Sequence, residues 1–202
     1  MSKEIDGMLH NMENQDGIDL RKGCHDIIIS DITGRTGDDV VALTAIAKDK
    51  YTPGGSLKST HVMHSDWTKR EKDIYNIIIR NIVAHSNLCY TVRLLPVNTQ
   101  IRNVVIDGVI DTSPDTVNNT GGILLGALDF NYGKNSRDGM KNITVSNVIC
   151  NSKEAVTVEG YVCDSVISNV VSRNPQNPAI VIKRENGLIN TETSGLVVAK
   201  NN

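Results

Sequence analysis

Four carboxylates, placed in two short apolar segments, are the residues of this sequence best suited to do chemistry. They are Asp16, Asp19, Asp38 and Asp39. The first two lie in segment 14–20, and the last two open segment 37–43. If both segments are strands in successive turns of a coil, a strand spacing of ~4.8 Å brings Asp16, Asp38 and Asp39 to one face. Like charges this close raise the energy, and chains retain them mainly where they do chemistry.

We therefore predict an active site made of these three carboxylates, with Asp19 in a structural role beside a neighbouring turn. The alternative is that Asp16 caps a strand end and that Asp38 and Asp39 belong to a solvated turn.

An internal repeat of strand-like segments decides the fold class. Each copy begins with Asn or Asp, carries mainly β-branched residues at its second and fourth places, and has Asn, Asp or Gly at its sixth. The second, fourth and seventh residues are predicted to point inward. The sixth is predicted to take the left-handed backbone conformation that Asn, Asp and Gly tolerate. The copies are 26–32, 76–82, 103–109, 142–148 and 164–170, with a weaker sixth copy from Asn186.

A second set of short apolar segments follows most copies, about thirteen residues after the second position. The copies that begin at 142, 164 and 186 are 22 residues apart. A period near 22 with two or three short strands per turn predicts an all-β fold, the parallel β-helix, and crossover handedness makes it right-handed. A leucine-rich repeat would need a Leu-x-x-Leu-x-Leu frame, and a β-sandwich would not repeat its Asn positions. The second segments are Val40–Leu43, Tyr90–Leu95, Ala155–Val158 and Ala179–Ile182.

The N-terminal residues 3–12 are predicted to form a short helix that covers the open end of the coil. Ile5, Met8, Leu9 and Met12 fall at i, i+3, i+4 and i+7, which is one apolar stripe of a helix. A disordered tail is the alternative. Where the helix leaves the first coil uncovered, we expect self-association through that end.

The whole chain, residues 1–202, is predicted to be one domain with loops inserted between coils. The longest insert, 45–73, holds His61, His64 and the only tryptophan, Trp67. Long loops on a regular scaffold are where binding residues usually sit.

The composition excludes several classes of partner. The formal net charge is −2, with 21 Lys and Arg against 23 Asp and Glu, so no nucleic-acid partner is predicted. The sequence has no membrane-length apolar run and no signal peptide, which predicts no membrane partner and a cytoplasmic location as written. A natural N-terminus that extends further would make it extracellular. The four cysteines form no Cys-x-x-Cys pair and are predicted to be free, buried thiols, and no metal or cofactor is predicted.

Two motifs carry a resemblance to a known family. Asn14-Gln-Asp-Gly-Ile-Asp is followed about twenty residues later by Gly37-Asp-Asp and a Val-rich strand. In type, order and spacing, this pair resembles the polygalacturonases, glycoside hydrolase family 28, whose pattern is Asn-Thr-Asp-Gly-x-Asp and then Asp-Asp. The resemblance covers roughly residues 12–130. Members of that family have several coils before the first motif, where this chain has about thirteen residues.

The resemblance implies inverting hydrolysis of a pectin-like or related polysaccharide on a right-handed β-helix. Asp38 would be the general acid, and Asp16 and Asp39 would hold and activate the attacking water. Such a mechanism places roughly 6.5–9.5 Å between acid and base. The resemblance also gives substrate-binding positions, which are Arg93, His61 and Asn14.

Other family motifs are replaced in this sequence. The family's Arg-x-Lys becomes Arg93-Leu-Leu95, so the lysine that would clamp a uronate carboxylate is missing. No Gly-His-Gly occurs, and His61 takes its histidine's approximate place, with His64 as a rival. The family's tyrosine before the following strand corresponds to Gly121. These replacements predict a neutral sugar, or none, at the subsite after the cleaved bond.

Three functions remain open from the sequence. The first is a glycoside hydrolase acting on a poly- or oligosaccharide. The second is a carbohydrate-binding remnant of such an enzyme, with little or no turnover. The third is a polysaccharide lyase or epimerase, which ranks last because only Arg93 could supply the strong base beside the carboxylates. The fold alone does not choose among them.

Overall fold

The described part of the protein is all-β. The computed structural model describes residues 2–5, 8–11, 15–46, 72–114, 121–127 and 135–199. Within these ranges the chain forms fourteen strands and no α-helix. No segment there is therefore a helix of the length and apolarity needed to cross a lipid bilayer.

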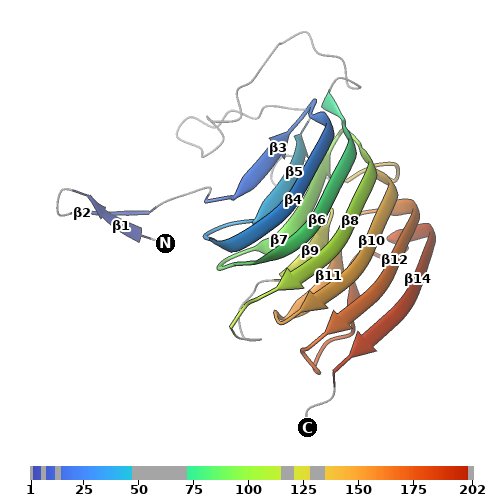
Figure 1. Ribbon diagram of the computed structural model, residues 1–202. Helices are drawn as coiled ribbons and strands as arrows, with labels where there is room; N and C mark the ends of the chain where they lie inside the picture. The colour runs from blue at the N-terminus through green and yellow to red at the C-terminus, as the bar shows by residue number, and fades with distance from the viewer. Residues whose placement is uncertain are drawn as a thin grey trace.

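Twelve of the strands form two parallel, six-stranded sheets, and the chain alternates between them (Figure 1). We call one the long-strand sheet. Its order is β4 (His25–Thr36), β6 (Ile74–Ser86), β8 (Ile101–Asp111), β10 (Met140–Cys150), β12 (Val162–Ser172) and β14 (Leu188–Val198). We call the other the short-strand sheet. Its order is β3 (Ile18–Arg21), β5 (Val41–Ile46), β7 (Tyr90–Val97), β9 (Gly121–Leu125), β11 (Glu154–Val158) and β13 (Ile180–Ile182).

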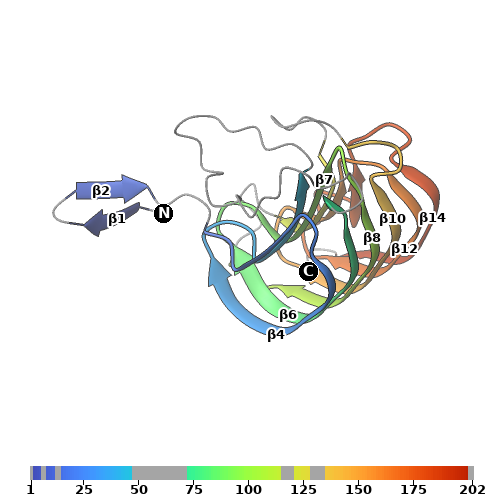
Figure 2. The same cartoon turned by 90° about the horizontal axis from the view of Figure 1, so that it is seen from above.

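Each strand pairs with the strand two places along the chain, so each turn of the chain adds one strand to each sheet. Figure 2 shows the long strands curving around one side of the resulting stack. The predicted all-β class is confirmed, and the two parallel sheets are consistent with a β-helix-like solenoid.

The N-terminal residues form a hairpin, so the predicted helix over 3–12 is wrong. β1 (Ser2–Ile5) and β2 (Met8–Asn11) pair antiparallel, with Ile5 opposite Met8. The sequence between these strands is Asp6-Gly7, a dipeptide that favours two-residue hairpin turns. The apolar spacing fitted a helix over only ten residues, too few for periodicity to outweigh that turn signal.

The repeat builds the core between the sheets as predicted. In the copy 76–82, Ile77, Ile79 and Ile82 at the second, fourth and seventh places are at most 1% exposed. The third residue faces outward, and Ile78 is 36% exposed. The parallel register places Ile79 opposite Ile29 on one side and Ile106 on the other, so equivalent residues stack in columns.

The bends of the long strands lie at two repeat positions. The sixth residue has positive φ as predicted, and the first residue, which the repeat pattern did not single out, has it too. Asn and Asp adopt this region at lower cost than other residues with a side chain. The ten such residues, with φ from 45° to 60°, are Asp26, Asp31, Asn76, Asn81, Asn103, Asn142, Asn147, Asp164, Asn169 and Asn190.

Amide ladders connect these bends from one strand to the next. Asn76 Nδ2 donates to Asp26 Oδ1 at 2.7 Å, and Asn103 Nδ2 donates to Asn76 Oδ1 at 3.0 Å. The last copy begins at Asn190, whose Nδ2 donates to Asp164 Oδ1 at 2.7 Å. The sixth copy therefore begins four residues after the predicted Asn186.

The inserts and cysteines complete the comparison with the sequence. β5 continues to Ile46 and β6 begins at Ile74, while residues 47–71 of the predicted insert lie outside the described residues. All four cysteines are free as predicted, although only Cys150 is buried.

Candidate active site

The three predicted catalytic carboxylates lie together at the start of the short-strand sheet. Ile18 N–H donates to Val40 O and Gly17 N–H to Asp39 O, each at 2.9 Å, which extends the β3–β5 pairing back to the carboxylates. Asp38 N–H donates to Gln15 O at 3.2 Å. These bonds place Asp16 beside Asp39 on the neighbouring strand. The predicted convergence of Asp16, Asp38 and Asp39 from successive turns is therefore present.

The backbone amide of Asp39 donates hydrogen bonds to two carboxylates. Its N–H lies 3.1 Å from Asp16 Oδ1 and 3.0 Å from Asp38 Oδ1. Because both oxygens accept the same N–H, they lie no more than about 6 Å apart. One amide thus holds two carboxylates from different strands at a fixed separation.

The side chain of Asp39 is buried and contacts the next strand of the sheet, β7. Its Oδ1 accepts the Tyr90 N–H at 3.0 Å, and its Oδ2 lies 3.3 Å from Arg93 Nη1. Only 5% of the side chain is exposed. Burial raises the pKa of Asp39 to about 6, although the Arg93 guanidinium and the Tyr90 amide oppose the shift. A carboxyl with this pKa can gain or lose a proton in mildly acidic solution.

Asp16 is half-buried and has acidic neighbours. Burial, followed by the charge of Asp38, raises the pKa of Asp16, while Arg21 opposes the shift. Desolvation contributes more than repulsion between the carboxylates to the raised pKa of both Asp16 and Asp39.

Asp19 pairs with a residue of its own strand, whereas the sequence placed it beside a neighbouring turn. Its Oδ2 contacts Arg21 Nη2. Burial raises the pKa of Asp19 to about 6, against the effect of Arg21. Asp19 therefore adds a further ionisable carboxyl beside Asp16.

Glycines in both motifs allow the close approach of the strands. A Cβ at Gly17 would lie 2.6 Å from the main-chain oxygen of Val40, which cannot move without breaking the β3–β5 pairing. A Cβ at Gly37 would overlap the side chain of Gln15. A side chain at Gly17 would therefore push the two strands apart, and one at Gly37 would displace the side chain of Gln15.

The Arg93-Leu-Leu95 segment makes its described contacts with Asp39 and with the protein interior. The Asp39 carboxylate raises the pKa of Arg93, although burial alone would lower it, so the guanidinium stays charged. Leu95 is 3% exposed and packs in a small apolar cluster with Ile46, Val97 and Ala127. The position that corresponds to the family's lysine is therefore buried.

Two neighbours of the site were missed in the sequence, and the strand register could have found them. Val41 lies opposite Val92, so Asp38 and Asp39 align with Cys89 and Tyr90. Sγ of Cys89 and one oxygen each of Asp38 and Asp39 lie within 4.8 Å of one another, a spacing that suits a metal ion. Burial raises the pKa of the Cys89 thiol, and Arg93 already pairs with Asp39. Both features work against metal ligation, which needs a thiolate and a free carboxylate.

The predicted substrate-binding residues Asn14 and His61 lie outside the described residues. Of the predicted site, the structure thus brings together Asp16, Asp38, Asp39 and Arg93. Comparison with protein-family models, curated proteins and solved structures finds no match for this chain.

Proposed function

We propose that this protein is a polygalacturonase-like glycoside hydrolase built on a right-handed parallel β-helix. The observation that carries the proposal is the convergence of Asp16 and Asp38 on the Asp39 amide. Carboxyl pairs at such separations are the usual means of cleaving glycosidic bonds. The handedness follows from the near-universal right-handed crossover between parallel strands.

In this mechanism Asp38 donates a proton to the glycosidic oxygen, and Asp16 and Asp39 hold and deprotonate the attacking water. The raised pKa values of Asp16 and Asp39 suit a general base that works in mildly acidic solution. Arg93 is a positioning residue, because its contact with Asp39 Oδ2 fixes the orientation of that carboxyl.

The separation of the carboxyls bears on the stereochemistry of the reaction. The upper bound of about 6 Å between Asp16 Oδ1 and Asp38 Oδ1 is shorter than the roughly 6.5–9.5 Å typical of inverting enzymes. For inversion, the Asp16 carboxyl must therefore hold the water on its side that faces away from Asp38. The anomeric form of the first product, measured by NMR before mutarotation, decides between inversion and retention.

A catalytically inactive glycan-binding protein is the second candidate. The observation in its favour is the burial of Asp39 and its pairing with Arg93, which is also what a purely structural ion pair would look like. A lyase or epimerase has less support. Its base would have to be Arg93, whose pKa is raised rather than lowered.

The test is Asp38→Asn in an assay of reducing-end release across a panel of pectic and neutral polysaccharides. We expect the parent to cleave at least one member in mildly acidic buffer and Asp38→Asn to lose about two orders of magnitude or more in rate. Asp31→Asn is the matched control, since Asn already occupies the equivalent repeat position at Asn81. An Asp38→Asn variant as active as the parent would remove Asp38 as the acid. A parent that binds one glycan but cleaves none would favour the binding protein.

A further inference from the structure

A column of residues leads from the carboxylates along the short-strand sheet. Asp16 lies beside Asp39, and the Tyr90 N–H bonds to the Asp39 carboxylate. Tyr90 lies opposite Gly121, which lies opposite Glu154. These five residues lie just before or at the start of five neighbouring strands of the short-strand sheet, β3, β5, β7, β9 and β11, and at ~4.8 Å per strand they cover ~19 Å. We call this set the starting column.

Tyr90 connects the two halves of the starting column. A Cβ at Gly121 would lie 2.5 Å from Tyr90 Cε1, so the ring occupies the space that this glycine leaves open. Burial raises the pKa of the Tyr90 phenol to about 12, and Lys183, Glu159 and Glu154 are among the charges that act on it. The phenol thus stays protonated and extends toward the far end of the column.

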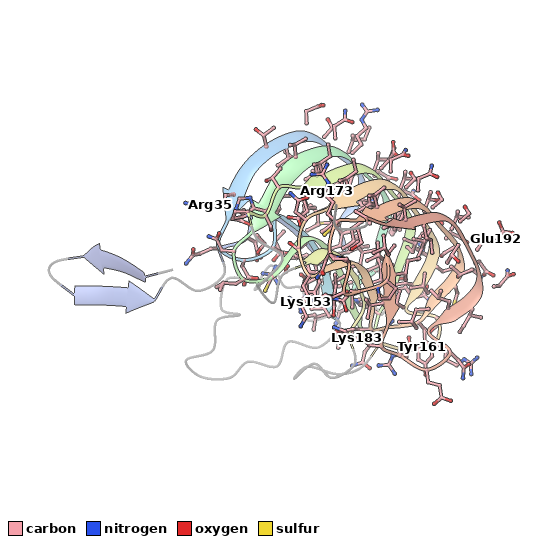
Figure 3. All side chains as sticks on the ribbon, turned by 90° about the horizontal axis from the view of Figure 1, so that it is seen from below. Arg35, Lys153, Tyr161, Arg173, Lys183 and Glu192 are labelled. Carbon is pink, nitrogen blue, oxygen red and sulfur yellow. The ribbon has the colours of Figure 1, made fainter. Side chains whose placement is uncertain are left out.

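An ion triad lies at that far end. Lys183 Nζ lies 2.8 Å from Glu154 Oε2 and 3.5 Å from Glu159 Oε1. Thr157 Oγ1 donates to the same Glu154 oxygen at 2.7 Å. The side chains of Lys183, Glu154 and Glu159 are 34%, 13% and 22% exposed. Figure 3 labels Lys183, which directly follows β13.

Carboxyls outnumber cations on this surface, and three of its cations are already paired. Arg21 contacts Asp19, Arg93 contacts Asp39, and Lys183 lies between two glutamates. The three paired cations and Lys153, whose charge lowers the pKa of Glu154, lie among six carboxyls, which are Asp16, Asp19, Asp38, Asp39, Glu154 and Glu159. An anionic polymer placed along the column would meet an excess of like charge, and it would have to break an ion pair to gain Arg21, Arg93 or Lys183.

We propose that the starting column binds an uncharged glycan and rejects polyuronates, with Tyr90 and the Lys183 triad as a distal sugar subsite. The inference rests on the proposed function for the direction of the substrate chain. Hydroxyl groups of a neutral sugar can accept from Lys183 or Tyr90 and donate to the glutamates without breaking the triad. The burial of Leu95 agrees with this specificity, because no cation replaces the family's uronate-binding lysine.

The experiment measures binding separately from cleavage. Hexasaccharides of glucose, galactose, mannose or rhamnose and a galacturonate hexasaccharide are titrated by calorimetry into Asp38→Asn, and the parent is assayed for cleavage of each. We expect at least one neutral hexasaccharide to bind about tenfold or more tighter than the galacturonate at low ionic strength. Lys183→Met should weaken that binding severalfold, and Glu159→Gln should improve galacturonate binding by freeing part of the Lys183 charge.

Glu192→Gln is the matched control. Glu192 belongs to β14 of the long-strand sheet and extends outward in Figure 3. Removing its charge should therefore change neither the affinity for the neutral hexasaccharide nor that for the galacturonate. Tighter binding of the galacturonate than of every neutral probe, or binding of no probe, would overturn the inference. Cleavage of polygalacturonate would also overturn it while the proposed hydrolase stands. Binding of a neutral probe without cleavage would leave this inference standing and remove the hydrolase.

Discussion

Asp39 makes contacts with the strands on both of its sides, through its backbone amide on one side and its carboxylate on the other. Its N–H holds Asp16 and Asp38, while its carboxylate receives Tyr90 and Arg93 from the next strand. A substitution at Asp39 would therefore disturb positioning and stability together. For this reason Asp38, whose side chain bonds to the Asp39 amide, is the better position for testing chemistry.

Asp19 gives the clearest link between the site and stability. Its pKa is about 6 in the folded chain, against 3.8 as the ordinary value. A raised pKa means that the protonated form stabilises the fold, and this contribution is lost as the pH rises through about 6. As the pH rises from 4 to 7, we expect the free energy of unfolding of Asp19→Asn to increase by about 2–3 kcal/mol relative to that of the parent. This value is reduced slightly for solvent screening.

Denaturant unfolding of both proteins at each pH measures this difference. Asp31→Asn should show the opposite sign, because hydrogen bonds from Ser30 and Asn81 lower the pKa of the exposed Asp31. A pH-independent difference between Asp19→Asn and the parent would show that Asp19 ionises as freely in the folded chain as in the unfolded one.

At the scale of strands, the repeat was enough to predict which residues point inward, because a parallel register stacks identical positions. The same reasoning predicted from the sequence that Asp16 lies next to Asp38 and Asp39. The N-terminal hairpin and the left-handed first residue of each copy were missed. Both depend on backbone dihedral angles, which apolar periodicity does not report.

The ion pairs of the site could not be predicted from the sequence either. Arg93 was expected to face a sugar, yet its guanidinium contacts Asp39 on the preceding strand. Strand alignment places residues side by side, but the direction of a long side chain depends on which buried charge lacks a partner. For Cys89 the strand alignment alone would have been enough, since it places Cys89 opposite Asp38.

Adjacent isoleucines on β6 test the register of the long strands. Ile79 is fully buried, and Ile78 is 36% exposed. We expect Ile79→Asp to cost several kcal/mol and unfold the protein, since it buries an unpaired charge, whereas Ile78→Asp should cost less than about 1 kcal/mol. Circular dichroism with thermal melts compares the two variants. Equal melting temperatures would show that the inward and outward faces are misassigned.

At the scale of the whole molecule, each strand is stabilised mainly by its two neighbours in the stack. β8 pairs with β6 and β10, and its core residues Val104, Ile106 and Val109 are fully buried. β14 pairs only with β12 among the described strands, and none of its residues is buried. Stability in such a stack is a sum of local and nearest-neighbour terms, so it should fall toward the end of the sheet.

Hydrogen exchange of backbone amides measures this gradient strand by strand. We expect the amides of β8 and β10 to exchange only through global unfolding. Those of β14 should exchange at least about a hundredfold faster, through local opening that leaves the rest of the sheet intact. The exposed Thr193 of β14 occupies the repeat position that Ile167 fills on β12. β14 therefore has little buried apolar contact to stabilise it. Equal protection of β8 and β14 would mean that the stack unfolds as one cooperative unit, and that nearest-neighbour stacking does not set its stability.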